Sequence, residues 1–197
     1  VCIGIEPDPF SRALAKEKMN IDLLDTTIEA FLTEEHGTFD HIFLDQVFEH
    51  LLAPLEVLTG LGRVLAPEGT IYIGVPGSYN PGVSMDRFYE LAHTYSYTPA
   101  TIRLFAAKAG LKVVSVRDPE GAALEVILAH LDSSYPEEHA DRLVQGSDWR
   151  DTVRRLKRKL FLNHVRGAVK RTLDAVVGPD LTQKLRAAID AIIRYRY

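Results

Sequence analysis

The chain has 197 residues, 46% of them hydrophobic and 25% charged, which is the composition of an ordinary globular protein. Its length is sufficient to bury the core of one domain and to carry an appendage. The lone cysteine, Cys2, excludes a disulfide framework and a multi-cysteine zinc site, and it fits a reducing, cytoplasmic location. No apolar run approaches the ~18 residues of a membrane span, so we expect no transmembrane helix.

Charge is divided unevenly along the chain, although the net charge is only −4. Residues 150–197 contain 13 Lys and Arg against four Asp, a net charge of +9. Residues 1–149 contain 10 basic and 23 acidic residues, a net charge of −13. The sequence therefore predicts an acidic body followed by a basic tail.

Strand-like and helical segments alternate up to about residue 131. Asp8 suits the N-cap and Pro9 the first position of a helix, and Thr98-Pro99 begins another helix that Gly110 ends. The predicted strands are residues 1–5, 21–25, 39–44, 70–75, 111–116 and 123–131. The predicted helices are residues 9–20, a short stretch that begins at 26–29, 54–65 and 98–110. This alternation predicts an α/β fold with a parallel sheet.

From residue 147 onward the pattern is helical only. Apolar residues recur every three to five positions, and the basic residues lie mostly between them, which is typical of amphipathic helices. We therefore divide the chain into an α/β domain, residues 1–146, and a basic amphipathic helical appendage, residues 147–197.

Candidate binding residues gather at the carboxyl ends of the predicted strands, where open parallel sheets bind ligands. Glu6 ends the first strand next to a helix start, and a carboxylate there can accept hydrogen bonds from both ribose hydroxyls. Taken alone, Glu6 is better explained as one of the acidic residues that commonly cap helices. The other residues at strand ends are 25–29, Asp45, Gln46 and 76–79.

The chain resembles class I S-adenosylmethionine-dependent methyltransferases in four segments, which are GIEPDPFSRALA, TIEAFL, FDHIFLDQVFEHLLAPLEVLTGLGRVLAPEGTIYIGVPG and HTYSYTPATIRLFAAKAGLKVV. The resemblance covers roughly residues 1–131 and is closest to the small-molecule group that includes the ubiquinone-biosynthesis-like O-methyltransferases. It implies a Rossmann-like, mostly parallel sheet with helices on both faces, and S-adenosylmethionine as the cofactor.

The resemblance also implies roles for particular residues around the adenosine of the cofactor. Glu6 would bind the ribose, with Pro7 beside the adenine. Thr27 and Ile28 would line the adenine, and Glu29 would meet its amino group. Without the resemblance, Thr27 is explained as a turn residue and Ile28 as its packing neighbour.

Nearer the reacting atoms, the resemblance places Asp45 and Gln46 against the methionine part of the cofactor. His50 and His93 are the candidate catalytic residues at the mouth of the site. The residues that would close over the substrate are His93, Tyr95 and Tyr97. The alternatives are that Asp45 caps the following helix, that His50 is a core histidine bound to a backbone carbonyl, and that His93 packs in an aromatic loop. No metal site is expected.

The glycine-rich loop that follows the first strand in this family is missing from these 197 residues. The only glycine cluster near a strand end, residues 74–82, has the wrong position and spacing for it. We therefore expect an upstream strand and glycine loop, on the order of 30 or more residues, in the natural protein.

The expected activity is methyl transfer to a small-molecule, sugar or lipid-linked acceptor, at oxygen. Alignment of the nucleophile and the methyl group would provide most of the rate enhancement. For an alcohol or phenol, His50 or His93 would remove the proton, whereas a carboxylate acceptor needs no base. The alternative is a non-catalytic methyltransferase-like binding or scaffold protein.

Three partners are open for the basic appendage. The first hypothesis is that it packs on the acidic body or on a second subunit of a homo-oligomer. The second is that it binds an anionic surface such as a membrane, and the third is that it binds nucleic acid. Nucleic acid is the least favoured partner, because residues 150–197 contain no recognised readout motif.

Overall fold

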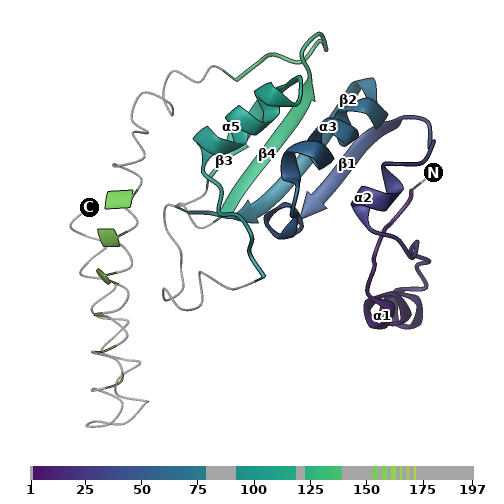
Figure 1. The fold of residues 1–197 in the computed structure, drawn as a ribbon, viewed down its shortest axis with the longest axis horizontal. Coiled ribbons are helices and arrows are strands. Elements are labelled where there is room, and N and C mark those ends of the chain that lie inside the picture. Colours follow the sequence, from purple (N-terminus) through teal and green to yellow (C-terminus); the bar gives the residue numbers. More distant parts are fainter. Residues whose placement is uncertain are drawn as a thin grey trace.

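The fold is seen in a computed structural model of the chain (Figure 1). The structure describes residues 2–78, 92–118 and 123–138, and nine helical positions between residues 153 and 171.

A four-stranded sheet forms the centre of the fold. Its strands are β1 (Phe39–Asp45), β2 (Leu65–Pro76), β3 (Leu111–Arg117) and β4 (Ala123–His130), and their order is β1-β2-β4-β3. β1 pairs parallel with β2, whereas β4 runs antiparallel to both of its neighbours, so three of the four strands point the same way. The residues between β3 and β4 are too few for the crossover that a parallel pair needs, which explains why β4 is reversed.

The two predicted strands at residues 1–5 and 21–25 appear as a single parallel bridge between Ile5 and Leu24. In Figure 1 this pair and α1 (Pro9–Met19) lie beyond β1, at the opposite end of the molecule from β3. We call the bridge and α1 the N-terminal unit.

The helices predicted within residues 9–110 are confirmed, and local signals explain the ends of two of them. α1 begins after Asp8, whose carboxylate accepts the Ser11 amide at 2.7 Å, and ends at Asn20 in the left-handed conformation. α5 begins after Thr98, which forms a capping box with Thr101. α5 spans Pro99–Lys108, and the other helices among the described residues 2–138 are α2 (Ile28–Phe31), the 3₁₀ turn η1 (Phe48–His50) and α3 (Pro54–Val64).

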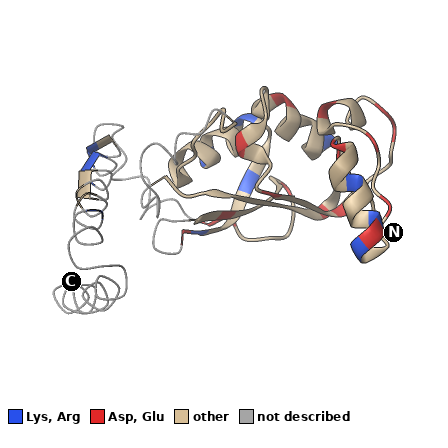
Figure 2. Ribbon diagram, turned by 90° about the horizontal axis from the view of Figure 1, so that it is seen from below, with Lys and Arg blue, Asp and Glu red and all other residues tan. Residues whose placement is uncertain are grey.

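The hydrophobic core lies between the sheet and the helices α3 and α5, which share one face of it (Figure 2). Leu58 of α3, Ile102 of α5 and Ile71 of β2 are all 0% exposed. On the other face, Phe43 is 75% exposed, and its ring packs against that of Tyr72, with ring centroids 5.9 Å apart. The sequence predicts helices on both faces; in the described part of the chain, α3 and α5 cover one.

The predicted appendage, residues 147–197, lies mostly outside the described residues. Its nine described positions are helical, and the Phe161 ring among them is 67% exposed. No described helix is both long and apolar enough to cross a membrane.

Replacing Leu58 by Ala is expected to destabilise the fold by about 2–5 kcal/mol, because the substitution leaves a cavity between α3 and the sheet. Leu104→Ala is the matched control, because Leu104 is 63% exposed on α5; we expect a change within about 0.5 kcal/mol. Urea unfolding followed by circular dichroism measures both. Equal losses of stability in the two variants would contradict this description of the core.

Candidate functional site

The carboxyl ends of β1 and β2 finish side by side because the two strands are parallel. Asp45, the last residue of β1, is opposite Gly74 of β2. A Cβ on Gly74 would collide with the Asp45 carboxylate and come within 3.0 Å of the Tyr72 hydroxyl, so a larger residue there would force these two side chains to move. Gln46 follows with a φ of 54°, and its amide donates to the Gly74 carbonyl at 2.8 Å. Asp45 and Gln46 therefore lie together at this edge of the sheet, as the sequence predicts.

The 3₁₀ turn η1 comes next and has two faces of opposite character. Phe48 is 0% exposed, and its ring lies 5.0 Å from that of Tyr97 and 6.3 Å from that of Phe105. Glu49 is 2% exposed, whereas the His50 side chain is 43% exposed. The buried phenyl ring anchors the turn in the core, and the anchored turn presents a carboxylate and an imidazole at the site.

Residues 92–98 return over η1 and bring His93 to His50. The His50 Nδ1 donates to the Ala92 carbonyl at 2.8 Å, and the Tyr95 amide donates to the Glu49 carbonyl at 3.2 Å. The imidazoles of His50 and His93 lie 5.0 Å apart between ring centroids. The structure therefore brings together the two histidines that the sequence singles out.

The two tyrosines of this segment have different surroundings. Tyr95 is 38% exposed. Tyr97 is 1% exposed, belongs to the core, and donates its hydroxyl hydrogen to the Phe48 carbonyl at 3.3 Å. Burial raises the pKa of the Tyr97 hydroxyl. Tyr97 therefore contacts η1 from the core through Phe48, whereas Tyr95 lies at the surface.

Glu49 is a charged residue that is almost completely buried, at 2% exposed. Neither of its carboxylate oxygens has a hydrogen-bond partner among the described residues, and Oε1 lies 3.8 Å from the Nε2 of His50. Burial raises the pKa of the Glu49 carboxyl, and the backbone amide of Glu49 and the neighbouring imidazoles of His50 and His93 oppose that rise. Glu49 is not among the site residues that the sequence predicts. Its place directly before His50 is a signal in the sequence, but its burial depends on contacts with residues 92–98.

A second group of predicted residues lies on the N-terminal unit. The Glu6 amide donates to the Leu24 carbonyl at 3.1 Å, so Glu6 lies next to the chain that leads into α2. The Glu6 Oε1 accepts the Asp8 amide at 2.9 Å. Pro7 is exposed between these two acids. Glu6 and Pro7 are therefore at the start of α1, as predicted.

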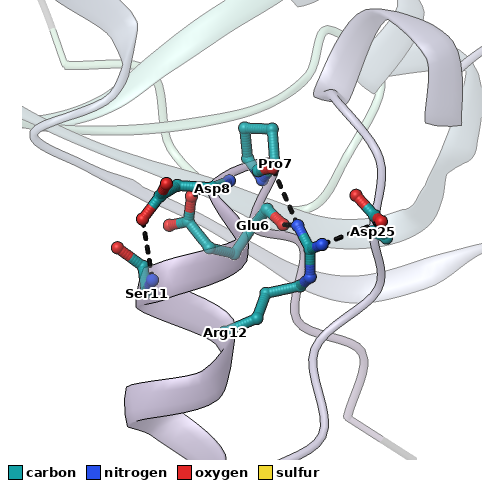
Figure 3. A network of polar contacts seen from close by, with 6 residues as sticks. All are labelled: Glu6, Pro7, Asp8, Ser11, Arg12 and Asp25. Carbon is teal, nitrogen blue, oxygen red and sulfur yellow. Dashed lines mark hydrogen bonds and ion pairs between the residues drawn. The ribbon is translucent and has the colours of Figure 1, made fainter.

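Arg12, which the sequence analysis did not single out, holds this second group together (Figure 3). Its Nη1 donates to the carbonyls of Glu6 and Pro7 at 2.8 and 2.7 Å, and its Nη2 pairs with Asp25 at 2.8 Å. The guanidinium has a fork of donors that reaches all three acceptors at once. The sequence places Arg12 six residues after Glu6 and about one turn into the predicted helix, and this spacing is the signal for the contact.

The remaining predicted residues lie at the start of α2. The Thr27 hydroxyl accepts the Ala30 amide at 3.2 Å and so caps the helix. Ile28 packs against the core, and Glu29 is exposed in the first turn. The capping role of Thr27 and the packing role of Ile28 match the structural alternatives that the sequence left open.

Comparison with known proteins identifies methyltransferases. A family model described as "Methyltransferase domain" matches residues 1–116. An S-adenosylmethionine-dependent methyltransferase from Archaeoglobus fulgidus is similar in structure, with a TM-score of 0.52 and 12% identity over 64% of this chain and 74% of that chain. A Listeria monocytogenes protein assigned to the same class gives a TM-score of 0.55 and 13% identity over 66% of this chain and 80% of that chain. No curated protein matches the chain. At these identities, the structural likeness shows a shared fold.

Replacing Arg12 by Ala is expected to loosen the strand end that carries Glu6. The variant loses two hydrogen bonds and an ion pair, but the Asp25 side chain is 74% exposed, so we expect a local loss of only about 1 kcal/mol. Amide hydrogen exchange at Glu6 and Leu24, whose amides bond across the bridge, should accelerate about fivefold.

Lys18→Ala is the control for this measurement. Lys18 lies near the other end of α1 and pairs with Glu17 on the surface, where their side chains are 62% and 68% exposed. Its loss should leave exchange at the bridge unchanged. Equal exchange rates in the Arg12 and Lys18 variants would show that Arg12 does not hold the strand end.

Proposed function

The chain belongs to the methyltransferase domain family, and we propose that it transfers the methyl group of S-adenosylmethionine to a hydroxyl oxygen of a small-molecule, sugar or lipid-linked acceptor. Family membership makes it a methyltransferase with S-adenosylmethionine as the methyl donor. The observation that carries the choice of a hydroxyl acceptor is the pair of imidazoles, His50 and His93, beside the carboxyl end of β1.

The residues at the two strand ends fit the chemistry of this cofactor. Its ribose offers two hydroxyl donors, and the Glu6 carboxylate stands at a strand end with lone pairs beyond the one that accepts Asp8. Its sulfonium and amino groups are cationic, and Asp45 is an exposed carboxylate at the end of β1. The residues that would hold the cofactor are Glu6, Pro7, Thr27, Ile28, Glu29, Asp45 and Gln46.

Bound S-adenosylmethionine supplies a methyl group on a sulfonium, which is already a good leaving group. The remaining task of the protein is to orient the acceptor and to take up its proton. The His50 Nδ1 is a donor because it bonds to the Ala92 carbonyl, so in the neutral ring Nε2 carries the lone pair. We assign the acceptance of the hydroxyl proton to this Nε2, with His93 as the second imidazole at the site.

The two tyrosines contribute in different ways under this proposal. Tyr95 is placed to contact the acceptor, because it is partly exposed beside η1. Tyr97 acts through η1, because its ring packs on Phe48 and its hydroxyl bonds to the Phe48 carbonyl.

Location and partners belong to the same proposal. A cytoplasmic location is supported by the single cysteine, Cys2, in the sequence. The basic appendage, residues 147–197, is proposed to contact either a second copy of the chain or an anionic surface, on the basis of its charge of +9 over residues 150–197.

Glu6→Ala is expected to weaken S-adenosylmethionine binding by about 10- to 100-fold, because a carboxylate that accepts two hydroxyl hydrogens is lost. Glu17→Ala on the exposed side of α1 is the control and should leave the affinity unchanged. Isothermal titration of the whole chain measures both. Unchanged binding in the Glu6 variant would remove Glu6 from the cofactor site, and no binding to the unmodified chain would favour the scaffold alternative.

The double variant His50→Ala/His93→Ala is expected to turn over a phenol or alcohol about 10²- to 10⁴-fold more slowly, because general-base catalysis is lost. Its affinity for S-adenosylhomocysteine should be unchanged. Release of S-adenosylhomocysteine across a panel of phenols, alcohols and carboxylates measures the rates. His41→Ala, which removes an exposed imidazole on β1, is the control. Undiminished turnover of every hydroxyl acceptor would discard the base role of both histidines.

A further inference from the structure

We propose that Glu49, His50 and His93 together form a binding site for a divalent transition-metal cation, with Zn²⁺ as the best-fitting ion. One oxygen or nitrogen atom from each of the three side chains lies within 4.8 Å of the other two. Two imidazoles and one carboxylate are a ligand set that Zn²⁺ accepts in sites that keep an open position. The sequence predicts no metal site, and Glu49 and His93 lie 44 positions apart in the chain.

The first support is the unbalanced carboxylate at the centre of the cluster. Glu49 is 2% exposed, and neither of its oxygens has a hydrogen-bond partner within the described residues. Burial of a charged carboxylate that accepts no hydrogen bond is costly, and a cation between it and the imidazoles would lower that cost.

The second support is the orientation of His50. Its Nδ1 donates to the Ala92 carbonyl at 2.8 Å, which leaves Nε2 as the ring atom with a free lone pair. Metal-bound histidines commonly donate their other ring nitrogen to a backbone carbonyl in this way, because the bond fixes the tautomer and the ring. The Nε2 lies 3.8 Å from the Glu49 Oε1, a separation that one cation at about 2.1 Å from each atom spans.

The third support is the access to the site. The cation would lie between a buried carboxylate and a His50 side chain that is 43% exposed, so solvent or an acceptor can reach it. The three ligand atoms lie within 4.8 Å of one another, whereas two metal–ligand bonds of about 2.1 Å span about 4.2 Å. A small rotation of the His93 side chain toward the other two ligands would close this difference. His93 belongs to the segment between Ala92 and Tyr95, whose backbone is already bonded to η1.

What the cation would do rests on the proposed function. A hydroxyl bound at its open position loses its proton to solvent more readily, because the cation stabilises the oxyanion. With the cation bound, the Nε2 of His50 is a ligand and no longer accepts that proton. The two roles therefore predict different responses to a chelator. If His50 acts as a metal-free base, methyl transfer is insensitive to the chelator, whereas if a cation activates the acceptor hydroxyl, methyl transfer slows when the cation is removed.

The test is metal binding by the whole chain, without cofactor or acceptor. After removal of metals with a chelator, Zn²⁺ is titrated by calorimetry, and Co²⁺ is added as a visible-absorption probe of its coordination. We expect binding at this site to weaken at least tenfold in Glu49→Gln and in His93→Ala, with loss of the corresponding Co²⁺ absorption. This readout is independent of methyl transfer, so a failed metal site and a failed methyltransferase proposal are distinguishable.

Glu34→Gln is the matched control. Glu34 lies 3.7 Å from His36, so this pair reproduces the glutamate–histidine contact of the site, and its carboxylate is 71% exposed. Its loss should leave Zn²⁺ affinity unchanged. Thermal unfolding of each variant verifies its fold, and His93→Ala decides the outcome where Glu49→Gln is unstable. Absent Zn²⁺ binding, or binding that neither Glu49→Gln nor His93→Ala weakens, would overturn the proposal.

Discussion

The parallel pairing of β1 with β2 is the constraint on which the rest of the site depends. Because the two strands run in the same direction, Asp45 and Gly74 finish at the same edge of the sheet. The absence of a side chain on Gly74 lets the Asp45 carboxylate approach β2, and Gln46 turns the chain back through a left-handed conformation. The next residues can therefore form η1 directly above the core.

The packing of the core and the geometry of the two imidazoles are coupled through η1. Phe48 is buried between Tyr97 and Phe105, while the next two residues of the same turn present the carboxylate and the imidazole of the site. Residues 92–98 contribute Tyr97 to the core and His93 to the site. A change that moves the Phe48 ring would therefore also move His50 relative to His93, because Phe48 and His50 belong to the same short turn, η1.

The sequence predicts best those features whose causes are local. The caps at Asp8 and Thr98 act within one helical turn, and the helices that follow them are confirmed. The antiparallel direction of β4 follows from the short connection after β3. The alternation of strands and helices, taken alone, predicts a parallel sheet. The burial of Glu49 and Tyr97 depends on contacts between η1 and residues 92–98. Spacing along the chain contains no information about such contacts. The sequence therefore cannot distinguish Tyr97, which is buried in the core, from Tyr95, which lies at the surface.

The buried Glu49 carboxylate connects structure and chemistry at this site. Its negative charge is compensated by a proton on its own oxygen, by a proton on one of the imidazoles, or by a cation held among all three groups. These states compete, because they use the same Glu49 oxygens and the same lone pair on the Nε2 of His50. A proton and a cation cannot occupy that lone pair together. His50 can therefore act as a base only while this lone pair is free, and it acts as a ligand when a cation occupies the lone pair.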